Sequence, residues 1–500
     1  MSTPTRTVWV LGDQLDERLA ALTEADPGTH RVLMVVSETK LASKRWHVQR
    51  AHLVLTAMHR FADRLRSVGW DVDLRDAPSL PAGLAAHRAE FGPVAVSATE
   101  PASIDGRAML LAHGVELVRT NQFLCHPDEF AEWAGDRKML RMEDFYRWQR
   151  RRLGVLMDGD EPAGGRWNFD EENRQPPPKD GRNHWPVPER FDLDDLDAKV
   201  VERLRPMTWG DAPTGWWPTS REQALARLDH FVTHSLPVFG PHEDAMTTGS
   251  WHLAHSLLAA PLNLGLLSPL EVVSAAEAAY RDGRAPIESV EGFVRQIIGW
   301  REYVHGVYWL WGPEYRSQNM LGAHHPLPPA FTGDAPTSMR CVSTTLADVR
   351  AQGWAHHIQR LMVLGNLALI AGIDPWAMTN WMWAGFVDGA EWVMTPNVIG
   401  MALHADGGRM ASKPYAAGGA YIDRMSDYCK GCAYDRTARV GENACPFTTL
   451  YWDFLDRHSE RFLRNARVAR QVRAGERLAD MDAVRVRARE VLARLDAGTL

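Results

Sequence analysis

Cysteines are the residues whose spacing suggests chemistry most directly. Cys429 and Cys432 are three positions apart on a turn that contains Gly431, and Cys445 follows, directly before Pro446. Three thiolates this close together can supply three corners of a metal tetrahedron. A cysteine followed by proline is also typical of iron–sulfur ligation. The spacing therefore predicts a metal ion or a cluster, and it leaves zinc and iron–sulfur both open.

A fourth ligand has to come from another part of the chain. The two remaining cysteines are Cys125 and Cys341, and Cys341 is the better candidate because it lies in the same helix-rich half. Disulfides are the rival interpretation, but they need an oxidising compartment. The first residues, Met1 to Arg6, lack the apolar core of a signal peptide. We therefore expect a cytoplasmic protein with metal-bound cysteines.

Two adjacent histidines are the second candidate for chemistry. His356 and His357 open an apolar stretch that reads as a helix. Neighbouring helical residues point about 100° apart, so both imidazoles cannot comfortably face one metal ion, but both can border a pocket. Histidine titrates near neutral pH and suits proton donation. Capping or core histidines are the alternative. Gly365 and Asn366 in the same stretch count against it, since glycine costs about 1 kcal/mol inside a helix and suggests a close approach.

Length and composition indicate a globular protein of several domains. The chain has 500 residues, of which 45% are hydrophobic and 24% charged. No apolar run reaches the ~20 residues that a membrane span needs. The net charge of -7 argues against indiscriminate binding to nucleic acid, but not against a local basic groove. Twenty tryptophans are most simply explained by a tryptophan-rich core, which composition alone favours, but they also suit an aromatic cofactor or electron transfer.

Residues 1–130 alternate short apolar runs with helical stretches, which predicts a doubly wound parallel sheet. Ligands of such sheets bind at the carboxyl ends of the strands, where Asp13, Gln14 and Gly106 lie. Taken alone, Asp13 is better explained as a helix N-cap. The expected helices are Arg45–Val68 and Ile104–His113. The expected strands are Thr7–Leu11, Arg31–Val36, Asp71–Leu74, Pro93–Ser97 and Val115–Val118.

Residues 131–220 change in character. Seven basic residues alternate with aromatic residues between Arg137 and Arg152. Such a helix can hold phosphates, or it can be a solvated helix docked by its aromatic face. From Asp158 to Pro218 the chain is rich in Pro, Gly, Asp and Asn, which predicts a long connector over the surface.

Residues 221–500 show helical patterns almost throughout, so the second domain is predicted to be all-helical. An Arg-rich helix is expected from residue 461 to Ala497, with a solvated basic face as the simplest interpretation. The other expected helices are Arg221–His234, Trp251–Ala260, Pro269–Asp282, Glu291–Trp311, Thr345–Ile370 and Pro375–Val387.

Taken together, several motifs resemble the photolyase/cryptochrome family, and in particular its iron–sulfur bacterial branch, whose characterised members repair pyrimidine (6-4) photoproducts. The resemblance covers essentially the whole chain and implies an antenna domain (1–130), a connector (131–220) and a helical FAD domain (221–500). The four cysteines are the most specific part and imply a [4Fe–4S] cluster in place of zinc. The motifs are Leu11–Leu15, Arg137–Arg152, Trp300–Glu302, His356–Met362, Asp388–Pro396, and Cys341, Cys429, Cys432 and Cys445.

The resemblance also implies where FAD binds. His255 and Ser256 match the start of a phosphate-contacting stretch, although Ala259 replaces its final serine. Asp388 matches the acidic residue near the flavin ring. The full set of expected FAD contacts is His255, Ser256, Leu257, Leu258, Asn263, Gln296, Trp300, Arg301, Asp388 and Asn397.

The catalytic and antenna residues are carried over in the same way. His356 and His357 match the two histidines of lesion repair, with His357 as the better proton donor. Trp381 matches a flavin-proximal electron donor. Met382 stands where many relatives have Tyr, so the usual electron path is in doubt; the expected detours are Trp354, Trp383 and Trp392. The expected contacts of a 6,7-dimethyl-8-ribityllumazine antenna are Asp13, Gln14, Glu38 and Gly106.

The resemblance thus implies a monomeric enzyme that binds UV-damaged DNA and repairs it with blue light, reduced FAD and proton donation from His357. Two other functions are compatible with the same residues. One is a blue-light photoreceptor without repair activity. The other is an iron–sulfur protein that binds nucleic acid without photochemistry.

Overall fold

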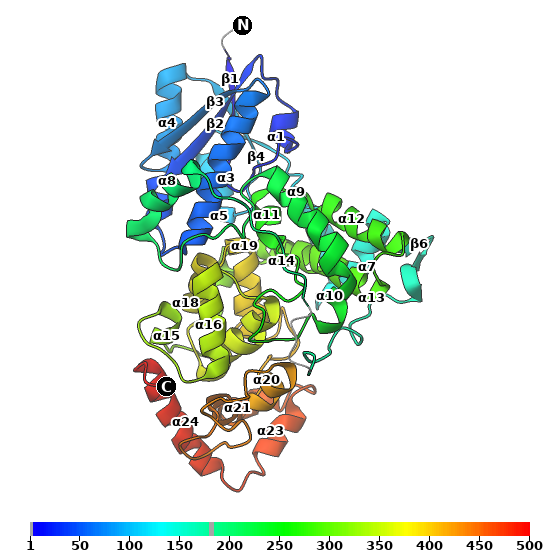
Figure 1. The fold of residues 1–500 in the computed structure, drawn as a ribbon, viewed down its shortest axis with the longest axis vertical. Helices are drawn as coiled ribbons and strands as arrows, with labels where there is room; N and C mark the ends of the chain where they lie inside the picture. The colour runs from blue at the N-terminus through cyan, green and yellow to red at the C-terminus, as the bar shows by residue number, and fades with distance from the viewer. Residues whose placement is uncertain (1–3, 180–184) are drawn as a thin grey trace.

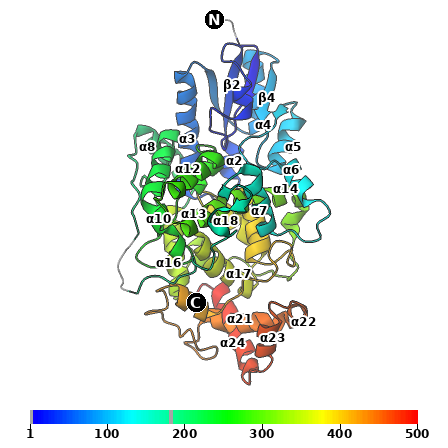
Figure 2. The same cartoon turned by 90° about the vertical axis from the view of Figure 1, so that its right-hand side faces the viewer.

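A parallel sheet lies at one end of the molecule and helices form the rest (Figures 1 and 2). The computed structural model describes residues 4–179 and 185–500. The sheet has the order β3-β2-β1-β4-β5, with every pair of neighbours parallel. This confirms the doubly wound fold class. The strands are β1 Arg6–Trp9, β2 His30–Ser37, β3 Asp71–Ala77, β4 Ala95–Thr99 and β5 Glu116–Val118.

Helices cover both faces of the sheet because the interior strand β2 is apolar on both sides. Val32 and Met34 of β2 pack in the core under α3 (Val48–Ser67), whereas Leu33 and Val35 pack in the core under α4 (Leu80–Phe91). This alternation is the two-residue period of a strand buried on both faces. The remaining helices of this half are α1 Ala20–Thr23, α2 Glu38–Ala42, α5 Ile104–Ala112, α6 Pro127–Ala134 and α7 Met142–Leu153.

The connector is more ordered than expected, because it contains helix α8 (Asp195–Leu204), which docks on α3. Nε2 of His52 lies 2.8 Å from Oδ1 of Asp197, and both side chains are buried. Arg60 of α3 also pairs with Asp197. This segment of the connector is therefore docked against the first half of the chain, where the ion pairs of buried Asp197 hold it.

The helical half confirms the expected class and several boundaries, including Pro269–Asp282 and Pro375–Val387. The predicted Glu291–Trp311 helix begins earlier and contains a π turn. The elements are α9 Arg221–His230, η3 Phe231–Ser235, α10 Leu236–Phe239, α11 Ala259–Leu264, α12 Pro269–Arg281, α13 Ile287–Val294, η5 Arg295–Arg301, α14 Glu302–Trp311, α15 Pro329–Thr332, α16 Arg340–Gln352, η7 Gln359–Gly365, α17 Asn366–Ala371, α18 Pro375–Gly385, α19 Glu391–Thr395, η8 Pro396–Ala402, α20 Gly419–Met425 and α21 Pro446–Arg457.

The predicted helix Trp251–Ala260 is wrong. Residues 251–258 form a loop in which Leu253 and Leu257 have positive φ angles of 44° and 56°. The hydroxyls of Ser250 and Ser256 accept backbone N–H bonds from Leu253 and Leu258. Such short-range side-chain bonds compete with helix formation. Helix α11 begins only at residue 259.

The predicted helix Thr345–Ile370 is also wrong as one element. Helix α16 ends at Gly353, whose φ of 62° makes a left-handed cap. Residues 354–356 are not helical, and helical backbone resumes at His357. Gly365 lies at the end of η7, where a Cβ atom would meet Ala402 at 3.0 Å. The close approach expected at this glycine is therefore made by η8.

The Arg-rich C-terminal stretch forms three helices instead of one. They are α22 (Ser459–Phe462), α23 (Ala469–Gly475) and α24 (Met481–Asp496), and α24 packs on α21 through buried Val484 and Val491. Six arginines of this stretch are exposed, as a solvated face requires: Arg461, Arg464, Arg467, Arg470, Arg473 and Arg477.

Among the helices of residues 4–179 and 185–500, none combines the length and the apolar character that a membrane span requires.

Candidate functional site

The four predicted cysteine ligands line one cavity. Cys341 lies in the first turn of α16, Cys429 and Cys432 in the loop after α20, and Cys445 directly before α21. Burial raises the pKa of Cys341 well above its usual value, and the three other sulfurs add to the effect. A bound cation is what keeps such a group of thiols deprotonated. The donor set therefore fits a metal or a cluster.

Cys125 lies elsewhere and is excluded as the fourth ligand. It is 1% exposed, and its backbone N–H donates to Oε2 of Glu302 at 2.8 Å. Cys341, from α16, lines the cavity together with Cys429, Cys432 and Cys445.

Three imidazoles meet at the second site. His255 comes from the loop before α11 and His356 from the non-helical segment after α16. His357 is the first helical residue after that segment. The rings of His255 and His356 stack with centroids 4.8 Å apart and an interplanar angle of 17°. One ring nitrogen of each of the three histidines lies within 4.8 Å of the others.

Several nitrogens of this cluster have no hydrogen-bond partner among the described residues. They are Nδ1 and Nε2 of His356, which is 1% exposed, and Nε2 of His255. Buried polar atoms are nearly always paired, so unpaired ones indicate a place where another group binds. The cluster is therefore a candidate ligand or substrate site.

The three imidazoles differ in their electrostatics. Burial holds the pKa of His255 and that of His356 well below the usual value, so both are neutral. For His357 burial acts in the same direction, but the Oδ1 of Asp244, 3.1 Å from Nε2, outweighs it and raises the pKa. The His357 side chain is 46% exposed. One imidazole of the three is thus set to carry a transferable proton near neutral pH.

Several residues expected to surround FAD lie near the histidine cluster. Trp354 lies beside His255, with ring centroids 6.1 Å apart. Arg360 pairs with Oδ2 of Asp388 at 3.0 Å, and Nδ2 of Asn263 donates to the Asp388 carbonyl at 2.9 Å. Oδ1 of Asp388 has no partner among the described residues. His255 thus stacks on His356, and Arg360 connects Asp388 to the histidine segment through its hydrogen bond to the Ala355 carbonyl.

Other expected FAD contacts lie on neighbouring elements. Ser256, Leu257 and Leu258 belong to the same loop as His255, whereas Gln296, Trp300 and Arg301 lie on η5. Arg301 pairs with Glu302 at 2.7 Å, and its guanidinium carbon lies 4.3 Å from the centroid of the Phe123 ring. Its Nε and Nη2 atoms are buried without a partner among the described residues. They are free to hold an anionic group.

Trp381 and Asn397 are engaged with their own surroundings. The indole N–H of Trp381 donates to the Phe331 carbonyl at 2.8 Å. The Asn397 amide donates to the carbonyl of Val393, one turn earlier, at 2.9 Å. Trp383, one of the expected detours for electrons, packs edge-on against Trp46 with centroids 6.3 Å apart.

The expected antenna residues lie at the carboxyl end of the sheet. The Gln14 amide donates to the carbonyls of Thr99 and Glu100, so it joins the loops after β1 and β4. Burial raises the pKa of Asp13, and no described helix begins near it, so it is not a helix N-cap. Gly106 lies in the first turn of α5 and Glu38 is exposed at the start of α2.

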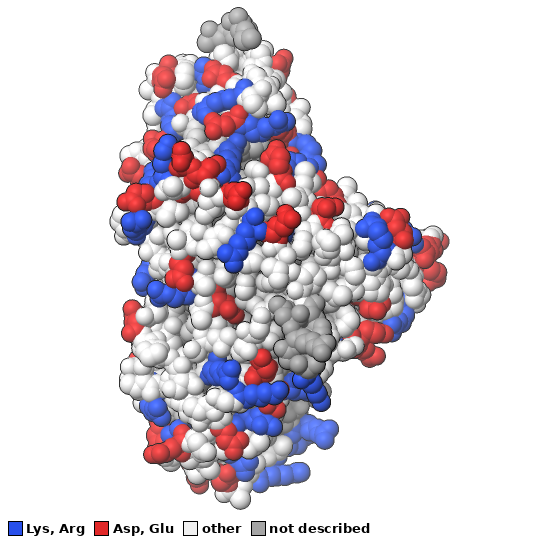
Figure 3. Space-filling model, viewed as in Figure 1, with Lys and Arg blue, Asp and Glu red and all other residues white. Residues whose placement is uncertain are grey.

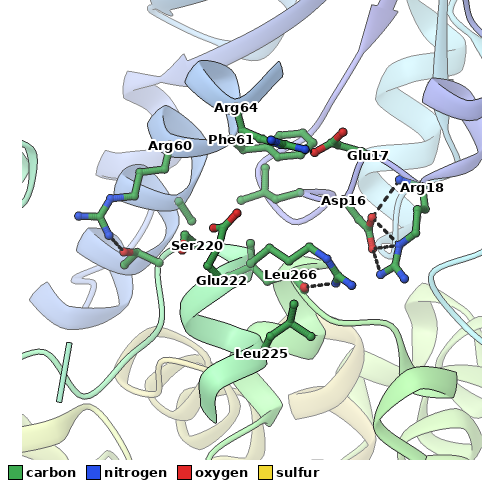
Figure 4. A pocket seen from close by; sticks show the side chains of 14 residues that line it. Asp16, Glu17, Arg18, Arg60, Phe61, Arg64, Ser220, Glu222, Leu225 and Leu266 are labelled. Carbon is green, nitrogen blue, oxygen red and sulfur yellow. Dashed lines mark hydrogen bonds and ion pairs between the residues drawn. The ribbon is translucent and has the colours of Figure 1, made fainter. Parts of the chain in front are cut away.

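A further cavity, of about 320 Å³, lies between the two halves of the chain (Figure 4). Its walls come from the loop after β1, from α3 and from α9. Leu15 and Leu225 provide apolar surface, and Arg18 pairs with Asp16 at 2.6 Å and with Glu271 at 3.2 Å. None of the expected site residues lines this cavity, which is a cleft between the two halves with ion pairs along its wall.

The basic aromatic stretch is mainly structural on one face. Arg150 is fully buried in α7 and donates to the carbonyls of Leu156 and Trp167. Phe145 and Tyr146 are fully buried. The alternative of a helix docked by its aromatic face is thus correct for this face.

Sequence reasoning missed Asp244, the carboxylate that raises the pKa of His357. It lies 113 positions from its partner, and no spacing or motif marks it. The role of Arg360 as the partner of Asp388 was missed as well, although the residue belongs to the motif His356–Met362.

Comparison with known proteins agrees with this architecture. The family model described as deoxyribodipyrimidine photo-lyase-related protein matches residues 8–217. A protein of Agrobacterium fabrum named (6-4) photolyase is 40% identical over 506 aligned positions, which cover 98% of this chain and 99% of the relative.

Two solved structures share the fold. A bacterial class III photolyase from Agrobacterium tumefaciens covers 99% of this chain and 98% of its own, with a TM-score of 0.57 and 17% identity. A Synechocystis cryptochrome covers 80% and 83%, with a TM-score of 0.53 and 14% identity. The chain therefore belongs to the photolyase/cryptochrome family, as its motifs predicted, and lies close to the Agrobacterium (6-4) photolyase.

Proposed function

We propose that this protein is a light-dependent DNA repair enzyme that reverses pyrimidine (6-4) photoproducts. The full-length relative with 40% identity carries that activity in its name. The observation that carries the proposal is the pair of His357 and Asp244 at the open side of two buried, neutral imidazoles. This arrangement suits protonation of a base that is flipped into the pocket.

FAD is the cofactor that this family implies, and the residues around Asp388 fit it. Unpaired buried atoms of Arg301 and Asp388 offer hydrogen bonds to a polar ligand. Reduced FAD, when bound, supplies the electron under blue light. The residues that would hold it are His255, Ser256, Leu257, Leu258, Asn263, Gln296, Trp300, Arg301, Asp388 and Asn397, and Trp381 would supply electrons to restore its reduced state.

The proposed proton donor is His357. Its imidazolium keeps Nε2–H on Asp244 and leaves Nδ1–H for the lesion. His356 is buried and neutral, so its nitrogens are available as hydrogen-bond partners of the base. Flipping the damaged nucleotide out of the duplex costs a few kcal/mol, and less where stacking is already poor.

Two further groups complete the proposal. Cys341, Cys429, Cys432 and Cys445 would hold a [4Fe–4S] cluster that ties the loop after α20 to α16. A lumazine antenna would bind at Asp13, Gln14, Glu38 and Gly106, at the carboxyl end of the sheet. The domains are then 1–130 for the antenna, 131–220 for the connector and 221–500 for FAD and the cluster, in a monomer.

Lys and Arg side chains suit the DNA partner. On the face seen in Figure 3 they gather at the right of the lower end, the end that holds α20–α23. Six exposed arginines lie in the stretch from Arg461 to Arg477. Binding through phosphates of this kind weakens as salt rises.

The test is repair of an oligonucleotide that carries one (6-4) lesion. Illuminated, reduced protein should restore both thymines, and protein kept in the dark should not. Bound flavin without repair would favour the photoreceptor function. Purified protein without flavin absorption would favour an iron–sulfur nucleic-acid-binding protein.

A further inference from the structure

We propose that His255, His356 and His357 form a binding site for a divalent transition-metal ion, with zinc as the preferred ion. The three side chains come from two segments about 100 positions apart and still place one ring nitrogen each within 4.8 Å of the others. None of the four cysteines assigned to the [4Fe–4S] cluster contributes to this histidine site.

The geometry needs only a small adjustment to bind a metal. Zn–N bonds of about 2.0–2.1 Å place the nitrogens of a tetrahedral site about 3.4 Å apart. Closing the cluster by about 1.4 Å is within the reach of side-chain rotation, because His357 is exposed. The restriction on neighbouring helical residues does not apply, since His356 precedes the helix. The ring centroids of His356 and His357 are 6.1 Å apart.

The unpaired nitrogens of the cluster point to a ligand. His356 is 1% exposed, and neither of its ring nitrogens has a partner among the described residues. Its ring stacks on that of His255, whose Nε2 is also unpaired in the described chain. Each neutral imidazole has one nitrogen with a free lone pair, and a single cation can bind the lone pairs of both rings.

Asp244 contacts the ring nitrogen of His357 that does not bind the proposed metal ion. It occupies Nε2 of His357 and leaves Nδ1 for the metal, which is the carboxylate–histidine–metal order of natural sites. The nearest ligands are then three imidazoles and no carboxylate. Such a donor set favours Zn²⁺, Cu²⁺, Ni²⁺ and Co²⁺ over Mg²⁺ and Ca²⁺.

The consequence is inhibition of repair, and this part rests on the proposed function. A metal on Nδ1 of His357 occupies the atom that would give its proton to the lesion, and it also takes the free nitrogen of His356. Zinc should therefore slow repair and a chelator should restore it.

Binding is tested by titrating flavin- and cluster-loaded protein with Co²⁺ in the dark. The expected result is one Co²⁺ per chain with the visible absorption bands of tetrahedral Co²⁺–imidazole, displaced by Zn²⁺. His356→Gln should abolish the bands. Asp244→Asn, which removes no metal ligand, should weaken binding by about 10–100-fold. His113→Gln changes an exposed histidine outside the cluster and should leave the affinity unchanged.

Three outcomes overturn the proposal: no tetrahedral bands, bands that survive in His356→Gln, or sulfur-to-cobalt charge-transfer absorption that ignores the histidine variants. Flavin absorption and the thermal midpoint show whether each variant is folded. If His356→Gln loses flavin, Asp244→Asn decides: unchanged affinity refutes the site. Because Co²⁺ binding needs no light or DNA, a protein that fails to repair DNA still gives a clear answer here.

Discussion

The cysteine cavity and the histidine cluster both gather side chains that can bind metals, but they differ in every other respect. The four cysteines have the same chemistry and face one cavity. The three histidines have different environments, since two are neutral through burial and one is paired with Asp244. A chemically uniform set suits a permanent group, whereas a mixed set with one exposed member suits a proton and a ligand that exchange.

The two regions are joined by hydrogen bonds. Tyr428 is fully buried directly before Cys429, and its hydroxyl accepts from Nε2 of Gln359 at 2.9 Å. Oε1 of Gln359 accepts from the backbone N–H of His356 at 3.2 Å. The segment that carries the cysteines thus helps to position the histidine segment.

Removal of one cysteine ligand should have the largest effect. Cys341→Ala takes away the one sulfur that α16 contributes to the cavity, so the proposed cluster should be lost and the C-terminal helices should lose the anchor that it would provide. Iron analysis and thermal unfolding measure both effects. The matched control is Cys125→Ala, which removes a buried sulfur outside the cavity and should keep the full iron content. Equal iron contents in the two variants would contradict the assignment.

Loss of His357 should abolish function without touching the cysteine site. His357→Ala removes the proton donor and should lower the rate of repair by about 10²–10⁴-fold, because that is the usual contribution of a positioned acid. Iron and flavin contents should stay as in the parent protein. His113→Ala is the control for a histidine on the surface. A repair rate that stays the same in His357→Ala would refute the role of this residue.

The pairing of His357 with Asp244 should appear in the pH dependence of repair. Asp244 raises the pKa of His357, and the imidazolium is the form proposed to donate the proton. Repair should therefore be fast at low pH and fall as pH rises through this pKa. Asp244→Asn removes the carboxylate and should move the fall to lower pH, while iron content stays constant. A pH midpoint that does not move in the variant would exclude Asp244 as the cause.

The smallest effect is expected at the bridge between the two regions. Tyr428→Phe removes one buried hydrogen bond, which should lower the free energy of unfolding by about 1 kcal/mol. The Gln359 amide keeps a second acceptor in Asp348, 3.3 Å away, so the iron content of the cysteine site should not change. Urea denaturation and iron analysis measure the two quantities. Loss of iron in this variant would show that the cysteine site depends on the histidine segment.

Much of the fold follows from local patterns. The five strands are visible because apolar runs alternate with helices, and α12 and α18 begin at proline and end near glycine or aspartate. Helix α4 was missed, although Ser79 and Pro81 mark its start, because its small residues give little periodicity. The loop at 251–258 and the break at 353–356 were missed because side-chain bonds and a left-handed glycine override an apolar pattern that resembles a helix.

For the candidate sites, the sequence by itself determined what lies within a few residues: the closely spaced Cys429, Cys432 and Cys445, and the adjacent His356 and His357. Only the tertiary structure shows that Cys341 lines the same cavity as the other three cysteines, that His255 stacks on His356, and that Asp244 pairs with His357. Spacing along the chain fixes the geometry of near neighbours through backbone dihedrals. Partners far apart meet only where helices pack, and burial then sets their charge.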